Sequence, residues 1–289
     1  MFKTVKELVE QASTSSLFEV IIESEMAQSG NSREMLIEKM SMQLDVMLRS
    51  IERGRQGVKS KTGLTGMDAQ KLNHYIHNHE SICGPTVMTA VQNAIGTNEV
   101  NAAMGLICAT PTAGSAGVVP GVLSALIERY DLSRQQQIEF LFIAGGFGLV
   151  IANNASISGA MGGCQAEVGS ASAMAAAATV SVLGGTPQMA ADACAMTIKN
   201  MLGLICDPVA GLVEVPCVKR NALGASQALV SADMALAGIQ SLIPVDEVIA
   251  TMHKIGTELP SKFRETGEGG LADTPTAREH QQRIFGDNE

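Results

Sequence analysis

Two long segments of this chain, residues 100–127 and 140–166, contain no Asp, Glu, Lys or Arg. Either segment is long enough to cross a bilayer as a helix. Proline interrupts the first segment at positions 111 and 120, and the second contains several glycines and polar residues such as Asn153. A helix that is apolar on all sides also occurs at the centre of a large core. We therefore predict buried central helices rather than membrane spans.

The composition favours closely packed helices. The 289 residues are 46% hydrophobic, but only 3% are aromatic and Trp is absent, whereas Gly and Met are abundant. Small residues allow helices to approach closely and Met fills irregular gaps, whereas β-sandwiches favour aromatic and β-branched residues. Alternating polar and apolar runs are missing, as are repeats and linkers. The prediction is one all-α, compact multi-helix domain over residues 1–289, with Gly/Pro-rich loops carrying the active site and a polar tail from about residue 275.

The charge balance excludes some partners and suggests a compartment. A net charge of −9 does not suit nucleic acid, because phosphate binding needs clustered Lys and Arg. Charged residues interrupt the N-terminal "MFKTVKELVEQAST", so we expect no signal peptide and a cytoplasmic location. In a reducing compartment, the six cysteines serve in metal binding, catalysis or inert burial rather than in disulfides.

Helix boundaries follow from periodicity and capping patterns. We expect capping boxes at Asn31 with Glu34 and at Ser133 with Gln136, and an N-cap at Thr186 before Pro187. Loops are expected at residues 54–69, 109–121 and 158–171. The predicted helices are two within 3–29, then 31–53, 69–80, 85–107, one from about 115 or 120 to 130, 133–158, about 171–183, 187–204, 221–241 and 245–259.

The cysteines fall into two groups. Those at positions 83, 108 and 194 lie in apolar, helix-like segments and are predicted to be core residues. Cys164, Cys206 and Cys217 lie in or beside irregular segments rich in Gly or Pro. Proline at positions 208 and 216 turns the backbone away from helix near the last two, and the segment between them can fold back to bring their sulfurs together.

Three thiolates allow more than one interpretation. Zinc can be held by three Cys and one His, although the five histidines, at positions 74, 77, 79, 253 and 280, are distant in sequence from these loops. Thiolates also hold iron–sulfur clusters, and a four-iron cluster with three protein ligands leaves one iron open as a Lewis acid. From the spacing alone, the default interpretation is that the three are unrelated cysteines of the core.

Five motifs carry a resemblance to a known family. In chain order, they are "SKTGLTGMDA", "TPTAGSAGVVPG", "GGCQAEVGSA", "CDPVAGLVEVPCVKRNALGA" and "RETGEGGLA". They resemble the motifs of bacterial iron–sulfur L-serine dehydratases, in particular the alpha chain of the two-subunit type. The resemblance extends from about residue 20 to residue 275.

The resemblance implies a lyase in which Cys164, Cys206 and Cys217 hold a [4Fe-4S] cluster. L-Serine would lose water by β-elimination, and the resulting aminoacrylate would hydrolyse to pyruvate and ammonia. The open iron would take the serine hydroxyl, and a base would remove the Cα proton. The sequence does not identify the residue that acts as this base.

Several loop residues are candidates for substrate contact. The alternative for each is that it only caps a helix or is a solvated loop residue. Lys61 or Arg264 is expected to pair with a carboxylate. Residues that directly follow a ligand cysteine are expected to support it. The substrate candidates are Ser60, Lys61, Thr62, Thr65, Thr112, Ser115 and Arg264, and the supporting candidates are Lys219, Arg220 and Asn221.

The sequence also departs from the family pattern. Single-chain relatives carry an additional N-terminal region with a Ser-Ser-His-Thr motif and a C-terminal cysteine, whereas this chain ends in "IFGDNE". The resemblance therefore implies a separate beta subunit and a homo- or hetero-oligomer. Met67 stands where we expect Gly. A preference between L-serine and L-threonine and a need for a monovalent cation do not follow from the sequence.

Two other functions are conceivable for this sequence. A pyridoxal-phosphate dehydratase needs a Schiff-base lysine and a Gly-rich phosphate cup, and "EGGLA" is too short for the latter. A non-enzymatic helical scaffold with inert or zinc-binding cysteines is the alternative, and it predicts a colourless protein.

Overall fold

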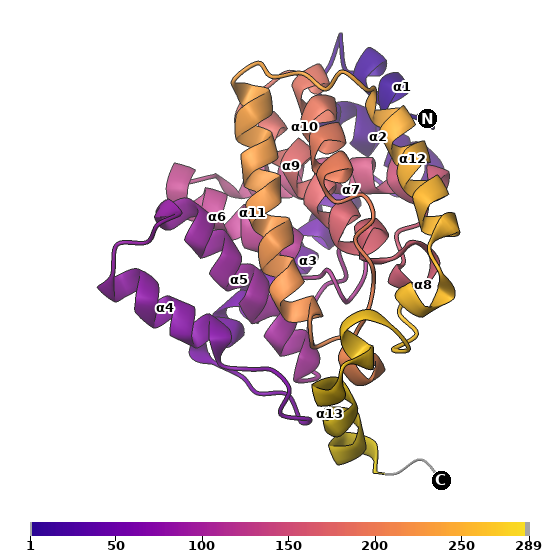
Figure 1. Ribbon diagram of the computed structural model, residues 1–289. Coiled ribbons are helices and arrows are strands. Elements are labelled where there is room, and N and C mark those ends of the chain that lie inside the picture. The colour runs from indigo at the N-terminus through magenta and orange to yellow at the C-terminus, as the bar shows by residue number, and fades with distance from the viewer. Residues whose placement is uncertain (1, 287–289) are drawn as a thin grey trace.

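Helices make up nearly all the regular structure of the computed structural model, which describes residues 2–286 (Figure 1). Within this range there are no strands, only isolated bridges between Lys59 and Gly66 and between Cys206 and Arg264. The all-α prediction is confirmed. The helices are α1 (Val5–Gln11), α2 (Leu17–Ser29), α3 (Arg33–Gln56), α4 (Asp68–Asn78), α5 (Gly84–Ala102), α6 (Val118–Tyr130), α7 (Arg134–Asn154), α8 (Gly159–Gly162), α9 (Ser170–Val182), α10 (Pro187–Asn200), α11 (Cys217–Leu236), α12 (Val245–Glu258) and α13 (Pro275–Phe285).

The Ala-rich helix α9 lies at the centre of the molecule and packs against α6, α7, α10 and α11 (Figure 1). Residues 170–180 are all buried, as expected for a helix with small side chains on every side. Helix α7 is the one described helix that is long and apolar enough to span a membrane, and 61% of its apolar window is buried inside the structure. The uncharged segment 140–166 is thus mainly core.

The other uncharged segment, 100–127, contains the end of one helix, a connecting stretch and most of a second helix. Its second half forms the buried helix α6, as predicted. Helix α5, however, ends at Ala102 rather than near residue 107, and Met104 and Leu106 are exposed beyond it. Met104 has a positive φ of 61°, which is incompatible with a continuing right-handed helix.

The capping predictions are confirmed at two of three sites. Ser133 and Gln136 form a reciprocal capping box, and the Thr186 side chain accepts a hydrogen bond from the Met189 N–H. The predicted box at Asn31 is wrong, because Ser32 caps α3 and accepts a hydrogen bond from the Met35 N–H at 3.3 Å. The Asn31 N–H instead donates to Ser29 Oγ, so the helix starts one residue later.

Three segments are more helical than predicted. Residues 158–171 are not a loop: they contain α8, a single π-helical turn η1 (Gln165–Gly169), and the start of α9. Helix α11 begins at Cys217, four residues earlier than expected. The polar tail from residue 275 is helical as far as Phe285, because Thr274 caps α13 and Pro275 occupies its first position.

Helices α3 and α5 cross at two glycines. A Cβ atom added to Gly54 would lie 2.4 Å from the backbone carbon of Gly96. No rotamer change can relieve a contact with backbone, so the crossing requires glycine at position 54. This close approach fixes the position of α5, which supports the loop at residues 109–117.

Gly54→Ala is therefore expected to lower the free energy of unfolding by about 1–3 kcal/mol, the usual cost of overpacking. Gly145→Ala in α7 is the control, because an added Cβ there meets nothing within 4 Å. It should be neutral or stabilising by up to about 1 kcal/mol through helix propensity. Urea unfolding measures both variants, and an equal effect in the two would contradict the tight crossing.

Candidate active site

Three separate elements bring Cys164, Cys206 and Cys217 together. Cys164 directly precedes η1, and Cys217 is the first residue of α11. Cys206 lies in an extended segment, where its N–H donates to the Phe263 carbonyl at 2.8 Å and its carbonyl accepts from the Glu265 N–H at 2.9 Å. All three thiols are buried, and those of Cys164 and Cys206 hydrogen-bond to each other.

The thiols influence one another's ionisation. The hydrogen bond with Cys206, together with the charge of Arg220, lowers the pKa of the Cys164 thiol. The same hydrogen bond and burial raise the pKa of Cys206, whereas burial and the charge of Cys164 raise the pKa of Cys217. The three thiols therefore do not ionise independently of one another. A set of three thiolates needs additional positive charge, which a metal centre supplies when thiols coordinate it.

Gly159, the first residue of α8, leaves space beside the thiols. A Cβ atom at this position would lie 2.9 Å from Cys206 Sγ, 3.0 Å from Glu265 Oε2 and 3.4 Å from Glu167 Oε2. One sulfur and two carboxylates therefore converge on a residue without a side chain. Any side chain here would fill the space between them.

The donor set at this site consists mainly of sulfur. Within residues 2–286, no group of three or more His, Cys, Asp or Glu side chains is arranged to hold a single metal ion. Three buried thiols from separate elements are a donor set that suits soft metal centres, and both zinc and iron–sulfur clusters accept such ligands.

Glu167 is a buried carboxylate next to the thiols. Thr112 Oγ1 donates a hydrogen bond to Glu167 Oε1, and Thr112 Oγ1 lies 3.1 Å from Ser115 Oγ. Burial, together with the negative charge of Glu265, raises the pKa of Glu167. Two of the predicted substrate candidates, Thr112 and Ser115, are thus held at this carboxylate.

Arg220 extends from α11 to the other side of the thiols. Its guanidinium donates to the Ile205 carbonyl at 2.9 Å and lies 2.8 Å from Asp207 Oδ1, and its charge acts on the Cys164 thiol. The contact with Asp207 is an ion pair without hydrogen-bond alignment. Asp207 Oδ2 in turn accepts from the Leu271 N–H at 2.8 Å. Arg220 therefore provides a fixed positive charge at the thiols, while Asp207 holds it in place.

Asn221 joins α11 to the loop at residues 109–117. Its amide donates to the carbonyls of Gly114 at 2.7 Å and Cys217 at 2.9 Å, and its Oδ1 accepts from the Gly117 N–H at 3.0 Å. The side chain is fully buried. It fixes the loop that carries Thr112 relative to the element that carries Cys217.

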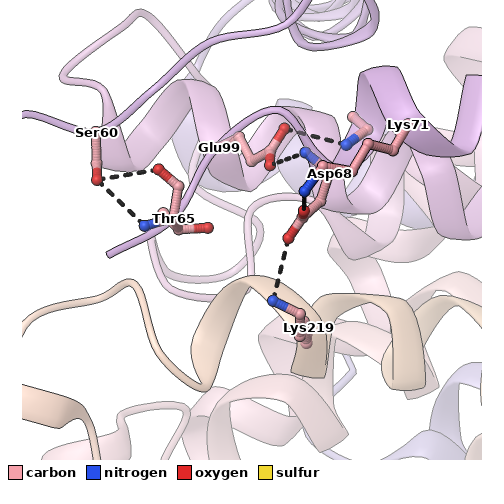
Figure 2. A network of polar contacts seen from close by, with 7 residues as sticks. Ser60, Thr65, Asp68, Lys71, Glu99 and Lys219 are labelled. Atoms are coloured by element: carbon pink, nitrogen blue, oxygen red, sulfur yellow. Dashed lines mark hydrogen bonds and ion pairs between the residues drawn. The ribbon is translucent and has the colours of Figure 1, made fainter. Parts of the chain in front are cut away.

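A second hydroxyl cluster lies on the hairpin at residues 57–67. Ser60 Oγ lies 3.0 Å from Thr62 Oγ1. It also donates to the Thr65 carbonyl at 3.1 Å (Figure 2). Thr62 Oγ1 donates to Glu214 Oε1 at 2.7 Å. Glu214 precedes Cys217 by three residues, and its carbonyl accepts the N–H of Val218 at 3.0 Å.

The basic candidates are placed differently from the hydroxyls. Lys219 Nζ pairs with Asp68 Oδ2 at 3.1 Å, and Figure 2 shows Asp68 between Lys71 and Lys219. Lys61 lines a surface cavity of about 400 Å³ with Arg283. Arg264 contacts Cys206 through the backbone bridge, and its Nε has no hydrogen-bond partner among the described residues. Met67 adopts the left-handed conformation, with φ of 67°, that the expected glycine would adopt freely.

The sequence analysis missed four acidic residues of this site. Glu167 is the first charged residue after the uncharged segment 140–166 and follows Cys164 by three positions. Glu214 precedes Cys217 by three positions. A carboxylate so close to a candidate ligand in an otherwise apolar segment was the available indication. Asp207 and Glu265 are also at the site, but only the folded chain places Glu265 beside Cys206.

Comparisons with known proteins agree with this architecture. A family model described as "Serine dehydratase alpha chain" matches residues 12–272. The "Probable L-serine dehydratase, alpha chain" of Bacillus subtilis is 60% identical over 288 residues, covering 99% of this chain and 96% of the relative. The "L-serine dehydratase, alpha chain" of Peptoniphilus asaccharolyticus is 41% identical, with 96% of both chains covered. L-serine dehydratase 1 of Escherichia coli is 43% identical over 62% of this chain, which matches 40% of that protein. The chain therefore belongs to the serine dehydratase alpha chain family, a family of lyases.

Proposed function

We propose that this chain is the alpha subunit of an iron–sulfur L-serine dehydratase of the cytoplasm, acting with a separate beta subunit. The observation that carries the proposal is the convergence of three buried thiols, one of which, that of Cys206, meets two carboxylates at Gly159. Relatives named as alpha chains of L-serine dehydratases, aligned over nearly the full chain, support the substrate and the partner.

The reaction removes the Cα proton and the β-hydroxyl of L-serine as water. The product aminoacrylate then hydrolyses to pyruvate and ammonia, so no external oxidant or reductant is required. Cys164, Cys206 and Cys217 would hold a [4Fe-4S] cluster, which when bound supplies a Lewis-acidic iron for the departing hydroxyl. Burial of the three thiols keeps bulk water away from the reacting atoms.

Glu167 is the side chain best suited to take the Cα proton. Its Oε1 is held by Thr112, while its Oε2 faces the space beside Gly159 and Cys206. A raised pKa makes a carboxylate a stronger base near neutral pH. Arg220 would balance negative charge at the thiols, and Asn221 would keep the Thr112 loop in register with Cys217.

The test is product formation by the complete enzyme under nitrogen. The chain, copurified with its beta subunit and reconstituted with iron and sulfide, should release pyruvate and ammonia from L-serine in equal amounts. L-Threonine in a parallel assay, which would yield 2-oxobutyrate, establishes the substrate preference. A fully reconstituted complex that releases neither keto acid would overturn the proposal.

A further inference from the structure

The Ser60–Thr62–Glu214 cluster has few hydrogen-bond donors, and this restricts what it can bind. Each hydroxyl has a single O–H donor. Thr62 donates its proton to Glu214 Oε1 at 2.7 Å. Ser60 donates either to Thr62 Oγ1 at 3.0 Å or to the Thr65 carbonyl at 3.1 Å. The Ser60 and Thr62 donors are therefore used within the cluster, and these two hydroxyls can only accept further hydrogen bonds.

Two buried oxygen atoms of the cluster have no hydrogen-bond partner within the described residues. They are Glu214 Oε2 and Thr65 Oγ1, and their side chains are 5% and 8% exposed. An unpaired carboxylate oxygen in a buried position is costly. A positively charged ligand that brings its own N–H donors would satisfy it. A carboxylate ligand would not, because it adds only acceptors and a second negative charge.

The cluster is close to one of the thiols along the chain. Glu214 precedes Cys217 by three residues, so the two Cα atoms are at most about 11 Å apart. Thr62 is only half-buried, so the cluster reaches the surface. In L-serine, the ammonium group and the hydroxyl group are on adjacent carbons. A molecule whose hydroxyl lies at the three-thiol site can therefore extend its ammonium toward Glu214.

We infer that Glu214, supported by Thr62 and Ser60, is the binding site for the ammonium group of the substrate. This assignment rests on the proposed function and adds a specificity determinant to it. Glu214 provides the counter-charge, and the hydroxyl lone pairs accept the ammonium N–H groups. Compounds with the same hydroxyl and carboxylate but no amino group would gain nothing from this cluster.

The test compares Glu214→Gln with wild type in the reconstituted two-subunit enzyme. The variant should raise KM for L-serine about tenfold to a hundredfold, the value of hydrogen bonds to a charged group. The inhibition constant of 3-hydroxypropanoate, which lacks the amino group, should change less than about twofold by the same argument. Thr62→Val, at a half-buried position, provides a second test if Glu214→Gln does not fold.

Glu99→Gln is the matched control. Glu99 is also a buried carboxylate and holds the end of the same hairpin, accepting from the N–H groups of Asp68 at 2.7 Å and Ala69 at 3.3 Å (Figure 2). It should leave the ratio of KM to the inhibition constant unchanged.

Three outcomes would overturn the assignment. A parallel rise of KM and of the inhibition constant in Glu214→Gln would show that Glu214 only holds the hairpin. A KM that is unchanged at saturating K⁺, with a shifted K⁺ activation curve, would assign the site to a free cation. Unchanged KM and inhibition constant in both Glu214→Gln and Thr62→Val would remove the site altogether. Wild-type enzyme without dehydratase activity is a separate result, and it would refute the proposed function instead.

Discussion

Glu167→Gln is expected to lower kcat for L-serine by about 10²- to 10⁴-fold, the usual contribution of a positioned general base. The amide keeps the size of the side chain and can still accept the hydrogen bond from Thr112, but it cannot take a proton. Cluster content and thermal stability should remain near the wild-type values. Anaerobic steady-state kinetics, with iron analysis of each preparation, measure the effect.

The pH profile provides the second part of this test. The base must be ionised to act, so wild-type kcat/KM should fall as the pH decreases through the pKa of Glu167. Burial raises this pKa, so the acidic limb should lie above the usual carboxylate range. Glu99→Gln, which removes another buried carboxylate, should keep this limb. A Glu167→Gln enzyme with near wild-type kcat and an unchanged limb would contradict the assignment.

Gly159→Ala is expected to prevent both cluster assembly and turnover. The added methyl group would lie 2.9 Å from Cys206 Sγ and 3.0 Å from Glu265 Oε2, so the sulfur and the carboxylate must move apart. A displacement of about 1 Å at a catalytic centre can cost on the order of 100-fold in rate. We therefore expect substoichiometric iron after reconstitution and a loss of activity of at least this size.

Gly145→Ala separates this effect from a general effect of adding a methyl group to a glycine. Gly145 lies in α7, and an added Cβ would meet no atom within 4 Å. This variant should keep full iron content and activity. If Gly159→Ala binds iron and turns over as well as Gly145→Ala does, the thiols and carboxylates do not depend on the space at position 159.

Local chemistry explains which parts of the fold were predictable from the sequence. Ser133 with Gln136 and Thr186 before Pro187 fix helix starts through contacts within a few residues, and both predictions are confirmed. The uncharged segment 140–166 indicated burial because a helix that is apolar on all sides is found inside a core or a membrane, and the polar residues of this segment favoured the core. Where a second local option existed, as at Asn31 and Ser32, the sequence did not decide between them.

The incorrect boundaries depend on long-range contacts. Gly162 and Gly163 indicated a loop, yet the helical turns around them pack tightly: a Cβ on Gly256 of α12 would lie 2.8 Å from Gly162 Cα. The Gln165 side chain also donates to the Met252 carbonyl of α12 at 3.0 Å. Such tertiary contacts stabilise helical backbone at residues whose local preference is for turns.

In the candidate site, too, the local features were predictable from the sequence and the long-range contacts were not. Cys164, Cys206 and Cys217 could be selected because their irregular surroundings distinguish them from cysteines in apolar helices. The place of Lys219 could not be predicted, because its partner Asp68 lies 151 positions away in sequence. Glu167 and Glu214 were missed because their functional value comes from loop hydroxyls that only the fold brings to them.

The central claim is that Cys164, Cys206 and Cys217 together hold an iron–sulfur cluster. The most direct measurement is the visible spectrum after anaerobic reconstitution with iron and sulfide, recorded for wild type, Cys206→Ala and Cys194→Ala. Cys194 is the control because it is fully buried in α10. The account predicts broad absorbance near roughly 400 nm in wild type and Cys194→Ala and its loss in Cys206→Ala. A colourless wild type in complex with its beta subunit, or an unchanged spectrum in Cys206→Ala, would contradict it.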